Sequence, residues 1–356
     1  MKKLITRGLA VILTCTLVFP QLLILSATRE NPSLNPAPRS VKVTPSRSTS
    51  RARAKAQAST QITGQTATSL PDSRLLLIGG QGADGTMATV AIKDPRTGEV
   101  TSTSTSLNQA RAWHTATMLP DGRVLVIGGM GANGKALASA EIFDPATQTF
   151  ELLLPPRFAH RAYHTATLLT DGKVLIAGGI SDNGRPSSSA QIWDFRTRIT
   201  NTLPGQLSVS RQKHRAILLA DGNVLLEGGI DENGNALAVA ELYNTEGRAF
   251  NFTTITSNAD ESGAPFLVAS LPRDGATDVS VESFISLRFS KPLRLETIST
   301  QSVKLVGSEG TIGIKVVPAE NGRLAFITPG GSLLSGGTYT LTIAAATGHP
   351  LKNRAD

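Results

Sequence analysis

The chain has 356 residues, with 35 Lys and Arg against 27 Asp and Glu, a formal net charge of +8 and one cysteine. Residues 1–60 hold ten basic side chains and one acidic one, a net charge of +9, so the rest carries about −1. The basic balance therefore indicates no basic face on the folded part, and no specific nucleic-acid binding is predicted. A single cysteine excludes a disulfide framework.

Residues 1–27 have the features of a secretory signal peptide. Three basic residues precede an apolar stretch from Gly8 to Leu25, and Ala27 supplies a small residue at a cleavage point. Cys15 lies inside this stretch, so a cleaved chain has no thiol chemistry. The stretch also approaches membrane-spanning length, which leaves cleavage and retention as an anchor as the two alternatives. Both predict a bacterial protein that is secreted or associated with the cell envelope.

Residues 28–64 are predicted to be a disordered linker. They are rich in Pro, Ser, Thr, Ala and Arg, and they hold seven basic residues and one acidic residue, Glu30. Such a segment has too little apolar surface to offset the entropy of ordering. The simplest interpretation is a solvated tether, and the alternative is electrostatic contact with anionic envelope polymers.

Residues 65–258 contain four copies of one pattern with a period of about fifty residues. Each copy has a short strand-like segment, a tight Asp-containing turn, an apolar run, a second turn, an alternating strand such as 140–144 and a short last strand. The apolar runs end at Gly79-Gly80, Gly128-Gly129, Gly178-Gly179 and Gly228-Gly229, which are spaced 49, 50 and 50 residues apart. A fixed period with strand-like content predicts a repeat of four-stranded antiparallel units.

A single four-stranded sheet cannot bury both of its faces, whereas sheets stacked around an axis can, which predicts a β-propeller. The order R-x-x-H, apolar run, Gly-Gly and E-[IL]-[FY]-[DN] resembles the kelch repeat. The first copy departs from it, with Gln65 in the place of the histidine. The resemblance implies an all-β, kelch-type β-propeller. Four visible blades leave three alternatives: a ring of four, blades pooled in a dimer, or further blades beyond this sequence.

Residues 263–356 change character and predict an Ig-like β-sandwich. Apolar residues alternate along short segments such as 285–289, 312–316 and 339–343, with Gly, Pro and Asn turns between them. The segments P-x-D-G-A-T-D-V, I-x-L-x-F-S-x-P-L, F-I-T-P and G-T-Y-T-L-T-I resemble the bacterial Ig-like domains first named for S-layer proteins. This resemblance implies a domain that acts as a spacer. Its last strand is expected to be incomplete, because the sequence stops within it.

Six residues are the binding candidates. A ring of Arg111, Arg161 and Arg211 near one mouth of the channel would bind an anionic ligand, or it would pair with acids of neighbouring blades. Trp113 and Tyr163 occupy the same position of the repeat, where the third copy has Lys213. Such variation at a fixed position is typical of a ligand-facing site and equally of a solvent-facing one. Glu227 places a carboxylate in an apolar strand and needs a partner, for which we expect a channel arginine rather than catalysis.

The repeated histidines His114, His164 and His214 reflect the period of the repeat rather than a metal-ligand geometry, and neither a metal nor another cofactor is predicted. Kelch propellers with Ig-like domains also occur in copper radical oxidases related to galactose oxidase. That chemistry needs a cysteine-linked tyrosine, which the cleaved chain lacks. We therefore expect a non-catalytic binding or adhesion module for a protein or glycan at the cell surface. The alternative is a carbohydrate-active or galactose-oxidase-like enzyme whose active site is incomplete in this chain.

Overall fold

The computed structural model describes residues 9–12, 62–154, 158–254 and 264–343, without the side chains of 9–12. The expected leader and linker therefore lie outside the described residues, apart from 9–12 and 62–64. The regular secondary structure of the described part is almost wholly β-strand, as the sequence predicts. None of its helices is both long and apolar enough to cross a membrane.

Each sequence repeat forms one four-stranded antiparallel sheet, so the predicted blades are confirmed. The first blade also carries a small hairpin of β4 (Gln81–Gly82) and β5 (Gly85–Thr86). The blades, each in the order inner to outer strand, are β2 (Thr66–Ser69), β3 (Leu75–Ile78), β6 (Val90–Lys93) and β7 (Val100–Ser102); β8 (Thr115–Met118), β9 (Val124–Ile127), β10 (Ala140–Asp144) and β11 (Thr149–Leu152); β12 (Thr165–Leu168), β13 (Val174–Ala177), β14 (Ala190–Trp193) and β15 (Thr200–Thr202); and β16 (Arg215–Leu218), β17 (Val224–Glu227), β18 (Ala240–Asn244) and β19 (Ala249–Thr253).

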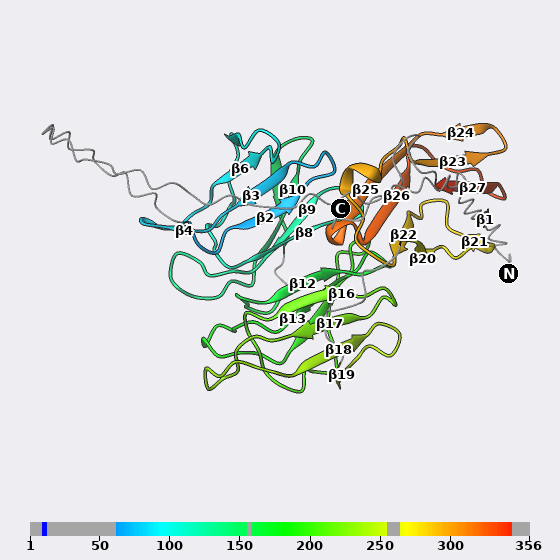
Figure 1. The fold of residues 1–356 in the computed structure, drawn as a ribbon. Coiled ribbons are helices and arrows are strands. Elements are labelled where there is room, and N and C mark those ends of the chain that lie inside the picture. The colour runs from blue at the N-terminus through cyan, green and yellow to red at the C-terminus, as the bar shows by residue number, and fades with distance from the viewer. Residues whose placement is uncertain (1–8, 13–61, 155–157, 255–263, 344–356) are drawn as a thin grey trace, which may run out of the picture.

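The four blades follow one another as an arc, with the inner strands β2, β8, β12 and β16 as successive neighbours (Figure 1). Each seam is tied by a hydrogen bond between a threonine hydroxyl of one blade and the histidine Nε2 of the next. The three pairs are Thr66 with His114 at 2.9 Å, Thr115 with His164 at 2.9 Å and Thr165 with His214 at 3.0 Å. The repeat therefore encodes the stacking of blades as well as the strands.

The apolar runs supply the core between blades. All four residues of β9 (Val124–Ile127) are buried, because this second strand has a blade on each side. A large aromatic residue on the third strand packs on a phenylalanine of the outer strand in blades two and four. The ring centroids are 4.9 Å apart for Phe143 and Phe150 and 5.0 Å apart for Tyr243 and Phe250. This packing fixes the outer strand of each of these two blades.

The C-terminal segment forms a sandwich of two sheets, as predicted. One sheet has the order β20-β22-β26-β25 and the other β21-β1-β27-β23-β24, and two short 3₁₀ helices connect strands. Their bounds are β20 (Leu267–Leu271), β21 (Ala276–Val279), β22 (Ile285–Phe289), η1 (Leu295–Thr297), β23 (Val303–Gly307), β24 (Gly310–Ile312), β25 (Ile314–Ala319), η2 (Glu320–Gly322), β26 (Leu324–Pro329) and β27 (Thr338–Ile343). Side chains of β22, such as Leu287, meet those of β23 and β27 in the sandwich core.

Strand β1 (Leu9–Ile12) belongs to the second sheet, between β21 and β27. It pairs antiparallel with β21 and parallel with β27, although it lies inside the expected leader, which was not predicted to join a domain. Cleavage of the leader stays a prediction, and it would remove this strand and open the edges of β21 and β27.

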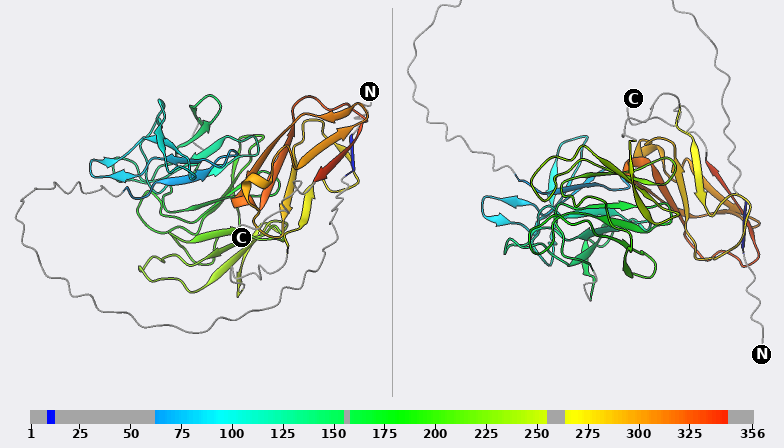
Figure 2. Two further views of the ribbon diagram at one scale, coloured as in Figure 1. Left: turned by 45° about the horizontal axis from the view of Figure 1, so that its top comes forward. Right: turned by 90° about the horizontal axis from the view of Figure 1, so that it is seen from below.

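The sandwich lies beside the blades and shares their core (Figures 1 and 2). Alternate residues of β26 explain this, because Ala325 and Ile327 face the sandwich core while Leu324 and Phe326 pack with the propeller. Both faces of the strand are therefore buried, which accounts for its unbroken apolar run.

The Asp-Gly turns of blades two to four form the docking points for the sandwich. Each turn contacts a different side chain of the sandwich: Lys315 donates from Nζ to the carbonyl oxygen of Asp121, Phe284 lies against Gly172, and Arg288 donates from Nε to the carbonyl oxygen of Ala220 at 2.9 Å. A turn that closes a hairpin in the repeat thus also holds the second domain.

Replacing Gly172 by Ala should weaken this docking. Gly172 has φ 81°, and a Cβ there would lie 2.6 Å from Phe284 Cζ. Gly184 has nearly the same φ, 77°, with no atom within 4 Å of its Cβ position, so Gly184→Ala carries the backbone cost alone. We expect Gly172→Ala to lower the free energy of unfolding by about 1–2 kcal/mol more than Gly184→Ala in urea titrations. Equal losses would contradict this role of the turn.

Candidate functional site

The three repeated arginines are buried inside their own blades. Arg111, Arg161 and Arg211 are 0–1% exposed. Nη1 of Arg111 donates to the carbonyl oxygen of Gly128 at 2.7 Å, and the same bond recurs in the next two blades at 2.7 and 3.1 Å. The expectation of an arginine ring that binds an anionic ligand is therefore wrong in this structure, because the guanidinium groups are enclosed by protein. The alternative prediction, that the arginines pair with acidic residues, agrees better with the structure, although these acids belong to the same blade and not to a neighbouring one.

The partner of each arginine stands thirty residues further along. Nη2 of Arg111 donates to Glu141 Oε1 at 2.7 Å, and Nη2 of Arg211 donates to Glu241 Oε1 at 2.6 Å. Blade three has Gln191 at this position, 3.5 Å from Arg161 Nη2. Burial lowers the pKa of Arg161 to about 10. These pairs brace the start of each inner strand against the third strand of its blade.

The repeated histidines hold the seams between blades. Each Nε2 is hydrogen-bonded to a threonine of the preceding blade, and the Cε1 side packs on that blade's first doublet glycine, as His114 does on Gly79. Burial lowers the pKa of His114 and of His214 to about 3, with the neighbouring arginine adding to the effect. The histidines are thus neutral at ordinary pH and act as packing elements.

Glu227 lies on the second strand of blade four, where its partner is the cross-strand neighbour Arg215. Arg215 Nη1 and Glu227 Oε1 are 3.6 Å apart, and the arginine side chain is 68% exposed. The carboxylate has the arginine partner that its position demands, but this arginine is not one of the three repeated arginines. Arg215 occupies the repeat position that contacts the following blade in the other three blades.

Trp113 and Tyr163 belong to a row of equivalent positions, one from each blade, that we call the ledge: Gly64, Trp113, Tyr163 and Lys213. The backbone amide of each residue donates to the carbonyl oxygen of the residue before it in the row, at 2.7, 3.0 and 2.9 Å. All four have positive φ, at 65°, 52°, 56° and 55°. Only the first blade uses glycine, which adopts this conformation without steric cost.

The side chains of the ledge lie one over the next. The Trp113 ring lies over Gly64, where a Cβ would be 2.8 Å from the indole. The ring centroids of Trp113 and Tyr163 are 5.1 Å apart with an interplanar angle of 31°, and Lys213 Nζ is 4.9 Å from the Tyr163 centroid. Trp113 and Tyr163 are half-buried and Lys213 is exposed. The row therefore presents two stacked aromatic rings and an ammonium group to solvent.

The ledge and the sandwich lie at opposite ends of the inner strands. The ledge residues directly precede strands β8, β12 and β16, whereas the Asp-Gly turns that hold the sandwich follow them. The inner strands are four residues long, so the two ends are about 13 Å apart. The ledge thus borders the mouth of the channel that the sandwich leaves open.

The opposite end of the channel holds Glu320, from η2 of the sandwich. The channel cavity there has a volume of about 400 Å³ and is lined by the inner strands and by residues 318–321. Glu320 Oε1 accepts the backbone amide of Leu168 at 2.7 Å, and burial raises the pKa of this carboxyl to about 7. Sequence reasoning missed Glu320, because nothing local distinguishes it from an exposed turn residue.

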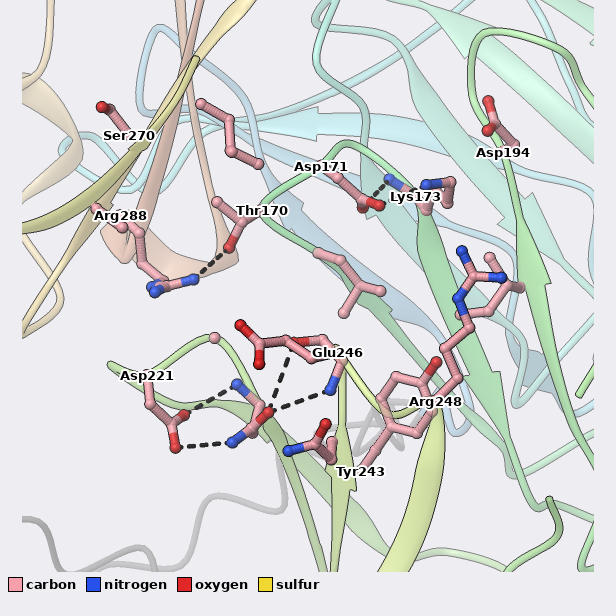
Figure 3. A pocket seen from close by; sticks show the side chains of 18 of the residues that line it. Thr170, Asp171, Lys173, Asp194, Asp221, Tyr243, Glu246, Arg248, Ser270 and Arg288 are labelled. Carbon is pink, nitrogen blue, oxygen red and sulfur yellow. Dashed lines mark hydrogen bonds and ion pairs between the residues drawn. The ribbon is translucent and has the colours of Figure 1, made fainter. Parts of the chain in front are cut away.

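A larger cleft of about 1000 Å³ lies between blades three and four and strand β20 (Figure 3). Several of its charged side chains are engaged with neighbours: Lys173 Nζ donates to Asp171, Asn223 donates to both carboxylate oxygens of Asp221, and Arg288 Nη1 donates to Thr170 Oγ1 at 2.8 Å. The Arg288 contact joins a turn of blade three to the sandwich, and we interpret the cleft as part of the domain interface. Among the described residues no three His, Cys, Asp or Glu gather as metal ligands.

Comparisons with known proteins agree with this architecture. A family model described as a bacterial Ig-like domain matches residues 261–353, and one described as a kelch motif matches 115–153. No curated protein is similar to the chain in sequence. Solved structures that match the chain include YjhT, at a TM-score of 0.41 and 14% identity over 54% of this chain and 84% of that chain. They also include a fungal alcohol oxidase of the AA5 family in complex with copper, at a TM-score of 0.39 and 12% identity over 74% and 78%.

The protein is therefore an all-β chain of kelch-type propeller blades followed by an Ig-like sandwich. More particularly, its second blade carries the kelch motif, and its C-terminal domain is a bacterial Ig-like domain.

Proposed function

We propose that this protein is an exported, non-catalytic binding module of the bacterial cell envelope, and that its ledge binds a glycan. The observation that carries the proposal is the row of stacked side chains of Trp113, Tyr163 and Lys213, held on a left-handed backbone. A side chain in this left-handed conformation costs about 1–2 kcal/mol. Blade one shows that glycine serves the same backbone path at Gly64. Three blades nevertheless keep a large side chain there. The outer turns at Gly98, Gln148, Arg198 and Arg248 share this backbone, so it is the stacking of the ledge side chains that supports a binding role.

The chemistry of the ledge suits a sugar. The two rings offer an apolar surface on which the C–H face of a pyranose packs, and the Tyr163 hydroxyl and the Lys213 ammonium supply polar contacts at its edge. Lys213 also favours a glycan that carries a carboxylate or another anionic group near the stacked ring. The bacterial Ig-like domain and the leader-like N-terminus support a location at the envelope.

Binding is expected to fall by about tenfold or more when Trp113 or Tyr163 is replaced by Ala, because truncated aromatic anchors typically lose that much affinity. The measurement is co-sedimentation with peptidoglycan sacculi and gel retardation by alginate, an anionic polysaccharide. Phe252→Ala is the matched control, since this aromatic side chain is 60% exposed on the outer strand of blade four. Binding that is lost equally with Phe252→Ala, or kept without the ledge rings, would contradict the proposal.

A further inference from the structure

The three seams within the arc use one set of contacts. The second doublet glycine donates its amide to the carbonyl oxygen at the repeated arginine position of the next blade, at 2.9, 2.7 and 2.8 Å. The first doublet glycine leaves room for that carbonyl, since a Cβ would lie 2.3–2.7 Å from it. The threonine-to-histidine hydrogen bond completes the seam. A face that carries a glycine doublet is thus built to receive another blade.

Blade four presents the same face with nothing on it in the described part of the chain. No atom lies within 4 Å of the Cβ position of Gly228, whereas all three equivalent glycines are in contact with the next blade. The amide of Gly229 has no backbone acceptor among the described residues. The exposed side chain of Arg215 extends over this face beside Glu227.

The two ends of the arc depart from the repeat at the same contact. Arg215 stands where Thr66, Thr115 and Thr165 are hydrogen-bonded to the next histidine, and Gln65 stands where blades two to four have that histidine. Gln65 donates from Nε2 to the carbonyl oxygen of Gly79 at 3.2 Å, and its Oε1 is a hydrogen-bond acceptor. A guanidinium donor on one end is therefore matched by an amide acceptor on the other.

Blade four departs from the repeat at a second position as well. Thr68 and Thr117 donate to the carbonyl oxygens of Ala116 and Ala166 across their seams. Ile217 has this position in blade four, and the alanine position of blade one, Ala67, is exposed. Blade one also exposes Ile62, at 46%, in place of the arginine that the other blades bury. Ile217 thus removes the threonine donor at one end of the arc, and Ile62 adds exposed apolar surface at the other.

We propose that blade four of one chain docks on blade one of a second copy, and blade one on its blade four, so that two arcs close one ring. Arg215 of each copy donates to Gln65 of the other, Ile217 covers Ala67, and Gly229 donates to the carbonyl oxygen of Ile62. Two arcs of four blades give eight, which lies within the range of known propellers. This inference is independent of glycan binding, because the ledge exists within a single chain.

Sedimentation equilibrium of the purified chain tests the proposal. Wild type is expected to have twice the chain mass. Arg215→Glu is expected to weaken association by about tenfold or more, since it places a second carboxylate beside Glu227 against an amide oxygen. Gln65→Arg should weaken association similarly, by opposing Arg215, and the double variant Gln65→Arg/Arg215→Glu should restore it as an ion pair between copies.

Arg248→Glu is the matched control, because this exposed arginine lies in the turn between β18 and β19 and borders the cleft between blades three and four rather than the face that carries Arg215. Circular dichroism establishes that each variant is folded. A wild-type monomer at the highest soluble concentration would overturn the proposal. So would a dimer that Arg215→Glu leaves unchanged, or a double variant that associates no better than the single variants.

Discussion

Replacing Arg111 by Met is expected to lower the free energy of unfolding by about 3–5 kcal/mol. The substitution keeps the apolar stem but removes the guanidinium that fills a fully buried site. It leaves Glu141 buried as a carboxylate, with only the neutral donors Asn108 and Gln109 as its remaining partners. A buried charge without its counter-charge is costly, which is why one member of such a pair is hard to remove. Urea titration measures the loss.

Blade three supplies the natural control for this prediction. Its arginine, Arg161, faces the neutral Gln191, so Arg161→Met leaves no buried carboxylate and is expected to cost less. By the same reasoning, Glu141→Gln in the Arg111→Met background should recover part of the loss. Equal costs in the two blades, with no recovery in the double variant, would show that charge burial is not the reason.

Replacing Glu320 by Gln is expected to stabilise the protein above pH 7 and to have little effect near pH 4.5. The folded-state pKa of Glu320 is about 7, against an ordinary value of 4.5. The folded protein therefore keeps a proton that the unfolded chain has lost, and its stability falls as pH rises from about 4.5 to about 7. The variant lacks this loss, which amounts to about 1–3 kcal/mol because the channel cavity gives the carboxyl some access to water.

The measurement compares urea titrations of the two proteins at several pH values. The buried histidines act in the opposite direction, because their lowered pKa values make stability fall as pH drops below about 6.5. Both proteins share these histidines, so the difference between them isolates Glu320. Gln retains an acceptor for the Leu168 amide, and Glu282→Gln, at an exposed site, is the control. A difference that does not change with pH would contradict the enclosed carboxyl.

The blade architecture was predictable because the same sequence pattern occurs four times. The Asp-containing turn, the apolar run and the Gly doublet recur at one spacing, and each local signal agrees with the same four-stranded sheet. The sandwich was predictable for a similar reason, since alternation along Ile285, Leu287 and Phe289 matches a strand with one face in a core.

The pairing of the repeated arginines within their own blades could have been predicted from the sequence. Blades two to four carry Glu or Gln thirty residues after the arginine, while blade one has Ile62 and Ala91 at the two positions. Loss of both residues together indicates a pair within the blade. The expectation of a ligand-binding ring considered each arginine without this partner.

Other features depended on contacts that no local pattern encodes. Phe284 contacts a turn more than one hundred residues earlier, and Glu320 accepts an amide from Leu168. The position of β1 between two strands of the sandwich also joins distant segments. Such contacts follow from how the two domains dock, which the alternation within each strand does not determine.

Fluorescence of Trp113 during titration with glycan tests binding at the ledge most directly. The chain has two tryptophans, and Trp193 is buried at 1% exposure, so Trp193→Phe leaves Trp113 as the reporter. Titration of this variant with soluble peptidoglycan fragments and with alginate oligosaccharides is expected to give a saturable change in emission for the glycan that binds, which Tyr163→Ala weakens. A folded protein that retains a glycan with no change at Trp113, or that responds to none of them, would contradict binding at the ledge.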